Sequence, residues 1–174
     1  MQNLFFTTPF IIFCCVISIT SGSIFTFIRD RYYRNIKDSI IDGIKLNRIQ
    51  AVQINGVKSK KTYIGLGASI LWELADIVFT DQKVFYFGFM KIFGHIPAYT
   101  RVERFYLGGE KSIHPLSKSI PIKSVSISGS DLIIISTRNL AKITTTLKDV
   151  EQTGQFKTIQ QMLNLPLIKK KILH

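Results

Sequence analysis

The sequence predicts a mainly β domain, an antiparallel sandwich or barrel, that follows an N-terminal transmembrane helix and ends in an amphipathic helix. Three observations support this fold class. The first 28 residues carry no charged or histidine side chain, and the middle of the chain is a series of short runs rich in branched and aromatic residues. After Asp149 the apolar residues return to helical spacing, up to Pro166.

The N-terminal segment, residues 1–28, is interpreted as a retained membrane anchor. Leu4 to Ile28 is 25 residues long, and as a helix it would span ~37 Å, more than the ~30 Å of a hydrocarbon core. Basic residues are absent before this segment and begin directly after it at Arg29, which favours an outside N-terminus and a cytoplasmic domain. Two alternatives stay open: a signal peptide cleaved near residues 20–23, and an apolar helix buried in protein.

The positive charge of the chain is concentrated next to the span and in the tail. Residues 29–61 carry nine basic and three acidic side chains, residues 62–151 carry ten and eight, and residues 152–174 carry four and none. Because a nucleic-acid binder would more often carry its positive charge on the folded domain, this distribution favours a membrane-surface role and no nucleic-acid partner. The topology rule for basic residues accounts for the same bias equally well.

Catalytic and metal-binding patterns are missing from the sequence. Both cysteines, Cys14 and Cys15, lie in the span, so the domain cannot form a disulfide. His95 and His114 have no further ligands at metal-binding spacing. Glu73 and Asp76 could form an acid–base pair, but we expect that one or both pair with a nearby lysine instead. We therefore expect no enzyme activity, no metal and no cofactor.

Residues 29–44 are predicted to form a basic, amphipathic juxtamembrane helix. Its basic side chains fall outside a row of apolar ones at spacings of three and four: Tyr33, Ile36, Ile40 and Ile44. This helix either continues the span or lies in the headgroup region, or it packs on the domain that follows.

Residues 45–165 are predicted to hold about seven short antiparallel strands and the final helix. Asn55-Gly56 is the strongest hairpin signal of the chain. The most apolar runs are residues 68–80 and 84–89, and shorter strands are expected over residues 102–107, 122–128, 132–136 and 140–147. Trp72, the only tryptophan, is expected in the core.

The stretch GLGASILWELADIVFTDQKVFYFG, residues 65–88, resembles the central strands of bacterial pleckstrin-homology-like (PH-like) domain proteins. The strand meander with a final helix, over about residues 45–165, is similar to the same fold. This resemblance implies a module that binds lipid headgroups, peptides or proteins and performs no chemistry. The basic loop with which such domains bind phosphoinositides would correspond most nearly to Lys58, Lys60 and Lys61, where this chain has no arginine.

These observations favour a membrane-anchored, non-catalytic module that presents a cytoplasmic surface to a protein partner or to anionic lipid headgroups. The alternative is a structural subunit of a membrane complex, whose domain is mainly a packing surface. The candidates for facing lipid or phosphate are basic side chains near the span and in the early strands: Arg29, Arg31, Arg34, Lys37, Lys58, Lys60 and Lys61. The basic tail, residues 166–174, adds a candidate membrane contact through Lys169, Lys170 and Lys171.

Overall fold

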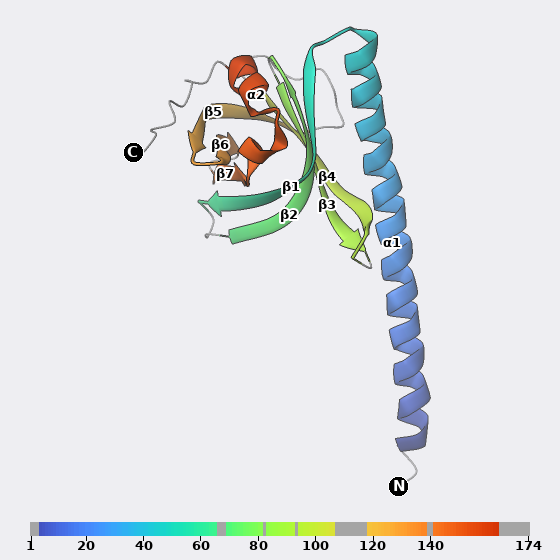
Figure 1. Cartoon of the computed structure of the whole chain (residues 1–174). Coiled ribbons are helices and arrows are strands. Elements are labelled where there is room, and N and C mark those ends of the chain that lie inside the picture. The colour runs from blue at the N-terminus through green and yellow to red at the C-terminus, as the bar shows by residue number, and fades with distance from the viewer. Residues whose placement is uncertain are drawn as a thin grey trace.

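The computed structural model describes residues 4–65, 69–81, 83–92, 94–106, 118–138 and 141–163. It consists of one long helix, a seven-stranded barrel beside the C-terminal half of that helix, and a short helix at one end of the barrel (Figure 1). The predicted fold class, a mainly β domain between an N-terminal apolar helix and a C-terminal helix, is confirmed.

The long helix α1 (Leu4–Leu46) joins the predicted span and the predicted juxtamembrane helix without a break. By length and composition it can cross a membrane: it contains a stretch of mean hydropathy 2.2, no residue of which is buried. The N-terminal half of α1 extends alone, away from the barrel, and the C-terminal half lies against the sheet (Figure 1). The juxtamembrane segment therefore continues the span and also packs on the domain.

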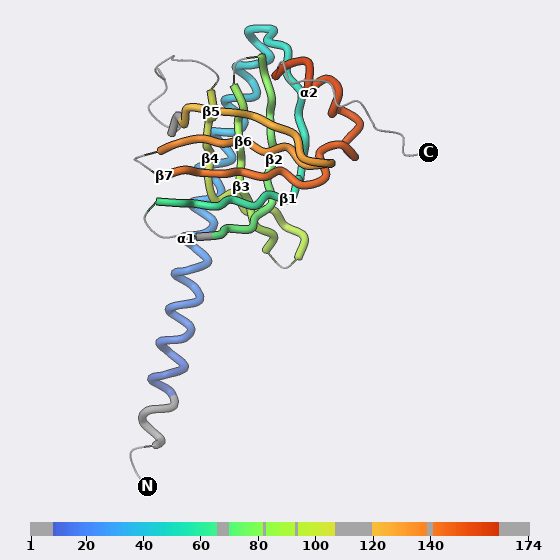
Figure 2. Tube along the Cα trace, turned by 90° about the vertical axis from the view of Figure 1, so that its left-hand side faces the viewer, coloured from blue at the N-terminus to red at the C-terminus, as the bar shows by residue number. Residues whose placement is uncertain are grey.

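The barrel strands follow one another in chain order: β1 (Ala51–Ile64), β2 (Ser69–Thr80), β3 (Lys83–Ile92), β4 (Ile96–Tyr106), β5 (Lys118–Ser128), β6 (Asp131–Arg138) and β7 (Ala141–Leu147). The strand β7 pairs with β1 and closes the barrel. The pair β4–β5 is parallel and the other pairs are antiparallel. Figure 2 shows the strands β5, β6 and β7 crossing over β2, β3 and β4.

The barrel interior is apolar at the end that the 3₁₀ turn η1 (Val150–Thr153) and the helix α2 (Phe156–Met162) cover. The side chains of Phe156 and Ile159 join one buried cluster with residues of the barrel strands such as Phe79, Phe105 and Leu132. The predicted amphipathic C-terminal helix is thus confirmed, and its apolar face closes this end of the barrel.

A second buried cluster lies outside the barrel, between α1 and the strands β2, β3 and β4. Its members are Ile36, Val78, Phe85, Phe87, Phe89, Tyr99 and Val102. The continuous apolar run in β3 reflects this arrangement, because one face of the strand points into the barrel and the other lies under α1.

The hairpin predicted at Asn55-Gly56 is wrong, since these residues form a bulge within β1. The register between β1 and β2 shifts between Ile54 and Val57, and Gly56 has φ of 66°, a conformation that glycine adopts without steric cost. Ile54 and Val57, three residues apart, both point into the barrel. The bulge therefore decides which later side chains of β1 face inward.

The expectation that Trp72 lies in the core is also wrong. Its side chain is 60% exposed on the outer face of β2. It pairs across the sheet with Lys60, whose ammonium lies 5.2 Å from the centre of the indole ring. Phenylalanines such as Phe79 and Phe105, both fully buried, fill the barrel in its place.

Asp131, at the start of β6, should make the stability of the domain depend on acid pH. Burial alone would raise the pKa of Asp131, but the Lys148 ammonium and the Asp149 amide bond to the carboxylate and lower the pKa below 3.8. This stabilisation is present above the ordinary pKa and disappears as the pH falls through the lowered one. We expect Asp131→Asn to lose about 0.5–1 kcal/mol at neutral pH, the scale of a partly screened contact.

Chemical unfolding of Asp131→Asn and of the unchanged protein across the acid range would check this prediction. The difference between the two should shrink toward zero as the pH falls through the lowered pKa of Asp131. Asp81→Asn, on an exposed carboxylate, serves as the matched control and should show no such difference. A difference for Asp131→Asn that persists at low pH would contradict the assignment.

Candidate functional site

A network of charged and phenolic side chains fills the barrel at the end opposite α2. Lys61 is fully buried, forms an ion pair with Glu103, and lies 3.6 Å from Glu73. The Nε atom of Arg101 lies 3.2 Å from the same Glu73 carboxylate, and the Tyr86 hydroxyl donates a hydrogen bond of 2.7 Å to it. Two cations and two carboxylates thus balance in charge inside the barrel, as burial of ions requires.

Burial shapes the acid–base behaviour of this network. It lowers the pKa of Lys61, against the attraction of Glu103 and Glu73, so the ammonium ion depends on both carboxylates to stay charged. Gly88 makes room for the close contacts, because a Cβ atom there would lie 2.6 Å from Glu73 Oε2 and 2.9 Å from Arg101 Cγ.

A groove of about 520 Å³ opens on the outside of the barrel, next to this network. Its lining combines apolar and basic side chains with one carboxylate and one hydroxyl, from α1, β1, β2, β3 and β4: Arg29, Lys58, Leu71, Trp72, Glu73, Leu74, Phe89, Met90, Lys91, Thr100 and Arg101. We call it the membrane-proximal groove for its place beside Arg29, the first charged residue after the stretch of α1 that is long and apolar enough to cross a membrane.

The membrane-proximal groove carries uncompensated positive charge. Arg29, Lys58 and Lys91 form no ion pair with any acidic side chain that the structure describes, whereas Arg101 is paired with Glu73. The Nε atom of Arg29 is buried and has no hydrogen-bond partner in the described part of the chain. The guanidinium carbon of Arg29 lies 5.6 Å from the centre of the Phe25 ring, so the charged group is next to an apolar side chain of α1.

The three basic candidates of β1 divide between the two faces of the strand. Lys58 lines the membrane-proximal groove, and Lys60 lies beside Trp72 on the same outer face. Lys61 points into the barrel, where it is fully buried. Its assignment as a lipid-facing residue is therefore corrected: side chains alternate along a strand, and Lys61 serves the buried ion network.

Lys37 also differs from its assignment as a lipid-facing residue. Its ammonium donates hydrogen bonds of 2.5 Å to Asp76 Oδ2 and to the Tyr99 hydroxyl, and its side chain is only 13% exposed. Burial alone would lower the pKa of Lys37, but these hydrogen bonds outweigh it and raise the pKa. Lys37 therefore holds α1 to the sheet rather than facing a membrane surface.

Arg34 joins α1 to the sheet as well, but its side chain stays half exposed. It forms an ion pair of 3.1 Å with Asp30 and donates a hydrogen bond of 3.2 Å to the Pro97 carbonyl. Arg31 is exposed on α1. The tail candidates Lys169–Lys171 lie outside the described residues.

The expectation that Glu73 and Asp76 pair with lysines is confirmed. Glu73 lies close to Lys61 inside the barrel, and Asp76 pairs with Lys37 under α1. The two carboxylates point to opposite faces of β2 and do not meet. No group of three or more His, Cys, Asp or Glu side chains within the described ranges could hold a metal ion. His95 lies in the exposed turn between β3 and β4, and His114 falls outside the described ranges.

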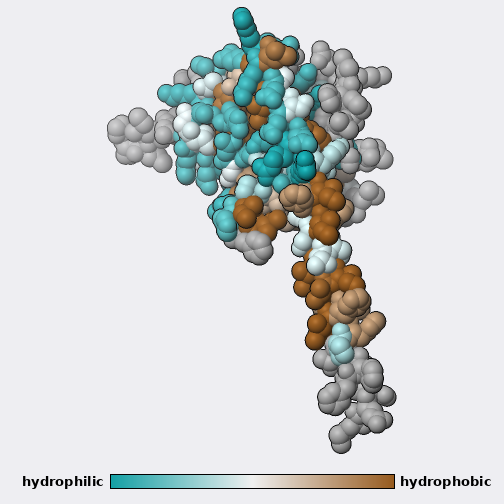
Figure 3. Space-filling model, turned by 90° about the vertical axis from the view of Figure 1, so that its right-hand side faces the viewer, coloured by the Kyte–Doolittle hydropathy of each residue, from teal (hydrophilic) through white to brown (hydrophobic). Residues whose placement is uncertain are grey.

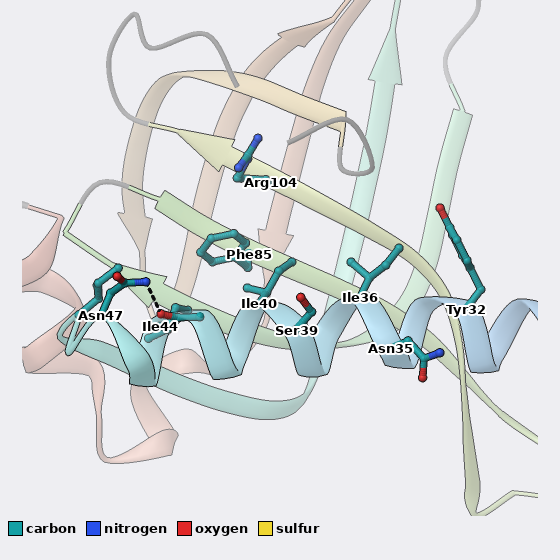
Figure 4. A pocket seen from close by; sticks show the side chains of 11 residues that line it. Tyr32, Asn35, Ile36, Ser39, Ile40, Ile44, Asn47, Phe85 and Arg104 are labelled. Carbon is teal, nitrogen blue, oxygen red and sulfur yellow. Dashed lines mark hydrogen bonds between the residues drawn. The ribbon is translucent and has the colours of Figure 1, made fainter. Parts of the chain in front are cut away.

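A second groove, of about 530 Å³, runs between α1 and the strands β3 and β4 (Figure 4). Ile36, Ile40 and Phe85 form its apolar lining, and Asn47 at its end donates a hydrogen bond of 2.8 Å to the Gly43 carbonyl. Arg104 reaches it from β4, where burial lowers the pKa of the guanidinium. Its lining is mainly apolar, with Asn35 and Arg104 among its polar members, and it includes no carboxylate.

The sequence analysis missed the contributions of Trp72, Met90, Lys91 and Arg101 to the membrane-proximal groove. These residues come from three different strands, β2, β3 and β4, and only the pairing of the strands brings them together. Part of this groove could have been predicted from the alternation of side chains along β1 and β2. Once the bulge in β1 is taken into account, this alternation places Lys58, Lys60 and Trp72 on the same face of the sheet. Comparisons with family models, curated proteins and solved structures found no match to this chain.

Proposed function

We propose that this chain is a membrane-anchored, non-catalytic, PH-like binding module whose membrane-proximal groove takes the anionic headgroup of a phospholipid. The headgroup belongs to the cytoplasmic leaflet, where α1 leaves the membrane, in the orientation that the basic residues after the span favour. In this proposal α1 holds the domain at the surface, and the groove supplies the selectivity for anionic lipids.

The Arg29 guanidinium, which lines the membrane-proximal groove and pairs with no carboxylate that the structure describes, is the observation on which this proposal rests. Arg29 follows the apolar stretch of α1 directly, so its guanidinium lies at headgroup depth when that stretch crosses the bilayer. Lys58 and Lys91 add two further cations to the same groove. Each such cation near an anionic surface contributes about 1 kcal/mol.

The PH-like part of the proposal is supported by the order of the elements. Seven strands in a closed barrel precede one helix that covers one open end of the barrel. This order is the one that the resemblance of residues 65–88 implies. A barrel of this kind binds its ligands with loops and outer faces, because side chains fill its interior.

Titration of the full chain in detergent with short-chain anionic phosphatidylglycerol would test the proposal. Trp72 is the only tryptophan and lines the groove, so its fluorescence reports binding directly. We expect a saturable change that weakens at high salt. Combined replacement of Arg29, Lys58 and Lys91 by glutamine should weaken binding about tenfold to a hundredfold.

Three parallel titrations decide the outcome. The matched control replaces three exposed lysines elsewhere on the domain, Lys123, Lys142 and Lys157, by glutamine and should bind like the unchanged protein. Short-chain phosphatidylcholine should produce no saturable change. Free glycerol phosphate should bind more weakly than the lipid, and equal binding would assign the groove to a soluble phosphate compound instead. An anionic lipid that leaves the Trp72 signal unchanged would overturn the proposal.

A further inference from the structure

We propose that the ends of the β1–β2 and β3–β4 hairpins form a second membrane contact, with apolar side chains that enter the interfacial layer of the leaflet that α1 crosses. This inference rests on the proposed function, because it requires α1 to be a membrane anchor. It adds to that function a non-electrostatic contact with the acyl-chain boundary, which needs no anionic lipid.

The exposed apolar side chains of the strands support this inference by their distribution. Within the described residues, five large apolar side chains are exposed on strands: Ile64, Ile70, Trp72, Met90 and Ile96. All five lie at the ends of β1, β2, β3 and β4 that border the two hairpins. The described parts of β5, β6 and β7 contribute none. A soluble surface would scatter such residues rather than collect them at one side.

The described strand ends that border the two hairpins lie on the side of the barrel toward which the N-terminal half of α1 runs, in two perpendicular views (Figures 1 and 2). The space-filling view shows apolar surface continuing from the free part of α1 onto the adjoining underside of the domain (Figure 3). The hairpin ends therefore face the membrane whenever α1 crosses it.

The depth of the β3–β4 hairpin follows from its contacts with α1. The Tyr99 amide donates a hydrogen bond of 2.7 Å to Asp30 Oδ1, which fixes β4 to the level of the first charged turn of the helix. Ile96 is three residues nearer the hairpin end, which is at most ~10 Å along a strand. The same distance covers roughly six or seven residues of a helix, so Ile96 reaches toward the level of the apolar residues before Arg29.

The side chains around this apolar set suit a bilayer interface better than a dry protein interface. Lys60 lies over the Trp72 ring, and Lys58 and Lys91 lie nearby in the membrane-proximal groove. Tryptophan and lysine together are the residues that anchor proteins at the headgroup boundary, where the ring is partly apolar and the ammonium reaches phosphates.

Quenching of Trp72 by brominated lipids would test the inference. The full chain is reconstituted in vesicles of neutral phosphatidylcholine with bromine near the headgroup end of the acyl chains. Because α1 contains no tryptophan, the signal reports the domain alone. We expect strong quenching that high salt leaves unchanged. The double variant Met90→Glu with Ile96→Glu should reduce quenching at least twofold, because it places two charges in the proposed contact.

The control variant Leu46→Glu places a negative charge on an exposed apolar residue at the C-terminal end of α1. Its Trp72 fluorescence should be quenched as strongly as that of the unchanged protein. Quenching that appears only when anionic lipid is added would overturn the inference and leave the headgroup proposal standing. Quenching in neutral vesicles, together with no response to short-chain phosphatidylglycerol, would support the inference and remove the headgroup proposal. No quenching in either vesicle would overturn the inference and assign this face to a protein partner.

Discussion

Replacement of Lys61 by methionine should lower the free energy of unfolding by about 3–5 kcal/mol, because it strands a buried carboxylate. Lys61 is fully buried and pairs with Glu103 while also lying close to Glu73. Without its ammonium, only Arg101 remains to balance the two glutamates. Methionine keeps the length and packing of the side chain, so the loss isolates the charge.

Urea unfolding of the full chain in detergent, followed by the circular dichroism of the sheet, would measure this effect. The matched control is Lys60→Met, the neighbouring lysine on the outer face of β1, which should change stability by no more than about 0.5 kcal/mol. The double variant Lys61→Met with Glu103→Gln should recover part of the loss, since it removes the stranded carboxylate as well. Equal stability of Lys61→Met and the unchanged protein would contradict a charged role for Lys61.

The contrast between Lys60 and Lys61 shows which features of the structure the sequence could predict and which it could not. The uncharged N-terminal stretch predicted the span, and the pattern of apolar residues predicted the juxtamembrane helix, the strands and the final helix, because these patterns are local. Side chains alternate between the two faces of β1, so one of two adjacent lysines faces inward. The bulge at Asn55-Gly56 shifts this alternation and thereby decides which lysine it is. Asn-Gly is compatible with both a hairpin turn and a bulge, since each needs a residue with positive φ. The local sequence could not separate them.

The placement of Trp72 shows a second limit of local reasoning. The run around Trp72 is apolar on both faces of β2, so periodicity alone does not say which face is buried. The inner face of β2 carries Ala75 and Ile77. On the outer face, the residues that follow Trp72 lie under α1. Trp72 itself is on the part of the outer face that α1 does not cover. Its exposure thus follows from where the helix leaves the sheet, which is a tertiary property.

In the proposed membrane-anchored arrangement, the contact between α1 and the sheet would determine how the domain is held above the membrane. An anchor joined by a flexible linker would leave the orientation of the domain free, whereas α1 continues from the apolar stretch onto the sheet as one helix. Hydrogen bonds from Lys37, Arg34 and the Tyr99 amide fix it there. Both the membrane-proximal groove and the hairpin ends therefore keep a constant height and direction relative to the span.

Asp76→Asn is expected to loosen this contact and to lower the free energy of unfolding by about 3 kcal/mol, because it leaves the largely buried Lys37 ammonium without a counter-charge. One carboxylate here joins three parts of the fold. Its Oδ2 accepts from Lys37 and from the Tyr99 hydroxyl, and its Oδ1 accepts from the Gly56 amide in the β1 bulge at 2.8 Å. Asparagine preserves the shape but offers one acceptor oxygen in place of two.

Hydrogen exchange distinguishes loss of this contact from general instability. In Asp76→Asn the amides of residues 30–46 of α1 and the Tyr99 amide should exchange faster, while the amides of β6 and β7 stay protected. Asp38→Asn, on an exposed carboxylate of α1 next to Lys37, is the matched control and should leave both regions unchanged. Adding Lys37→Met to Asp76→Asn should restore part of the stability, because the stranded cation is then gone. If Asp76→Asn matched Asp38→Asn in stability and exchange, the apolar contacts of α1 alone would hold it to the sheet.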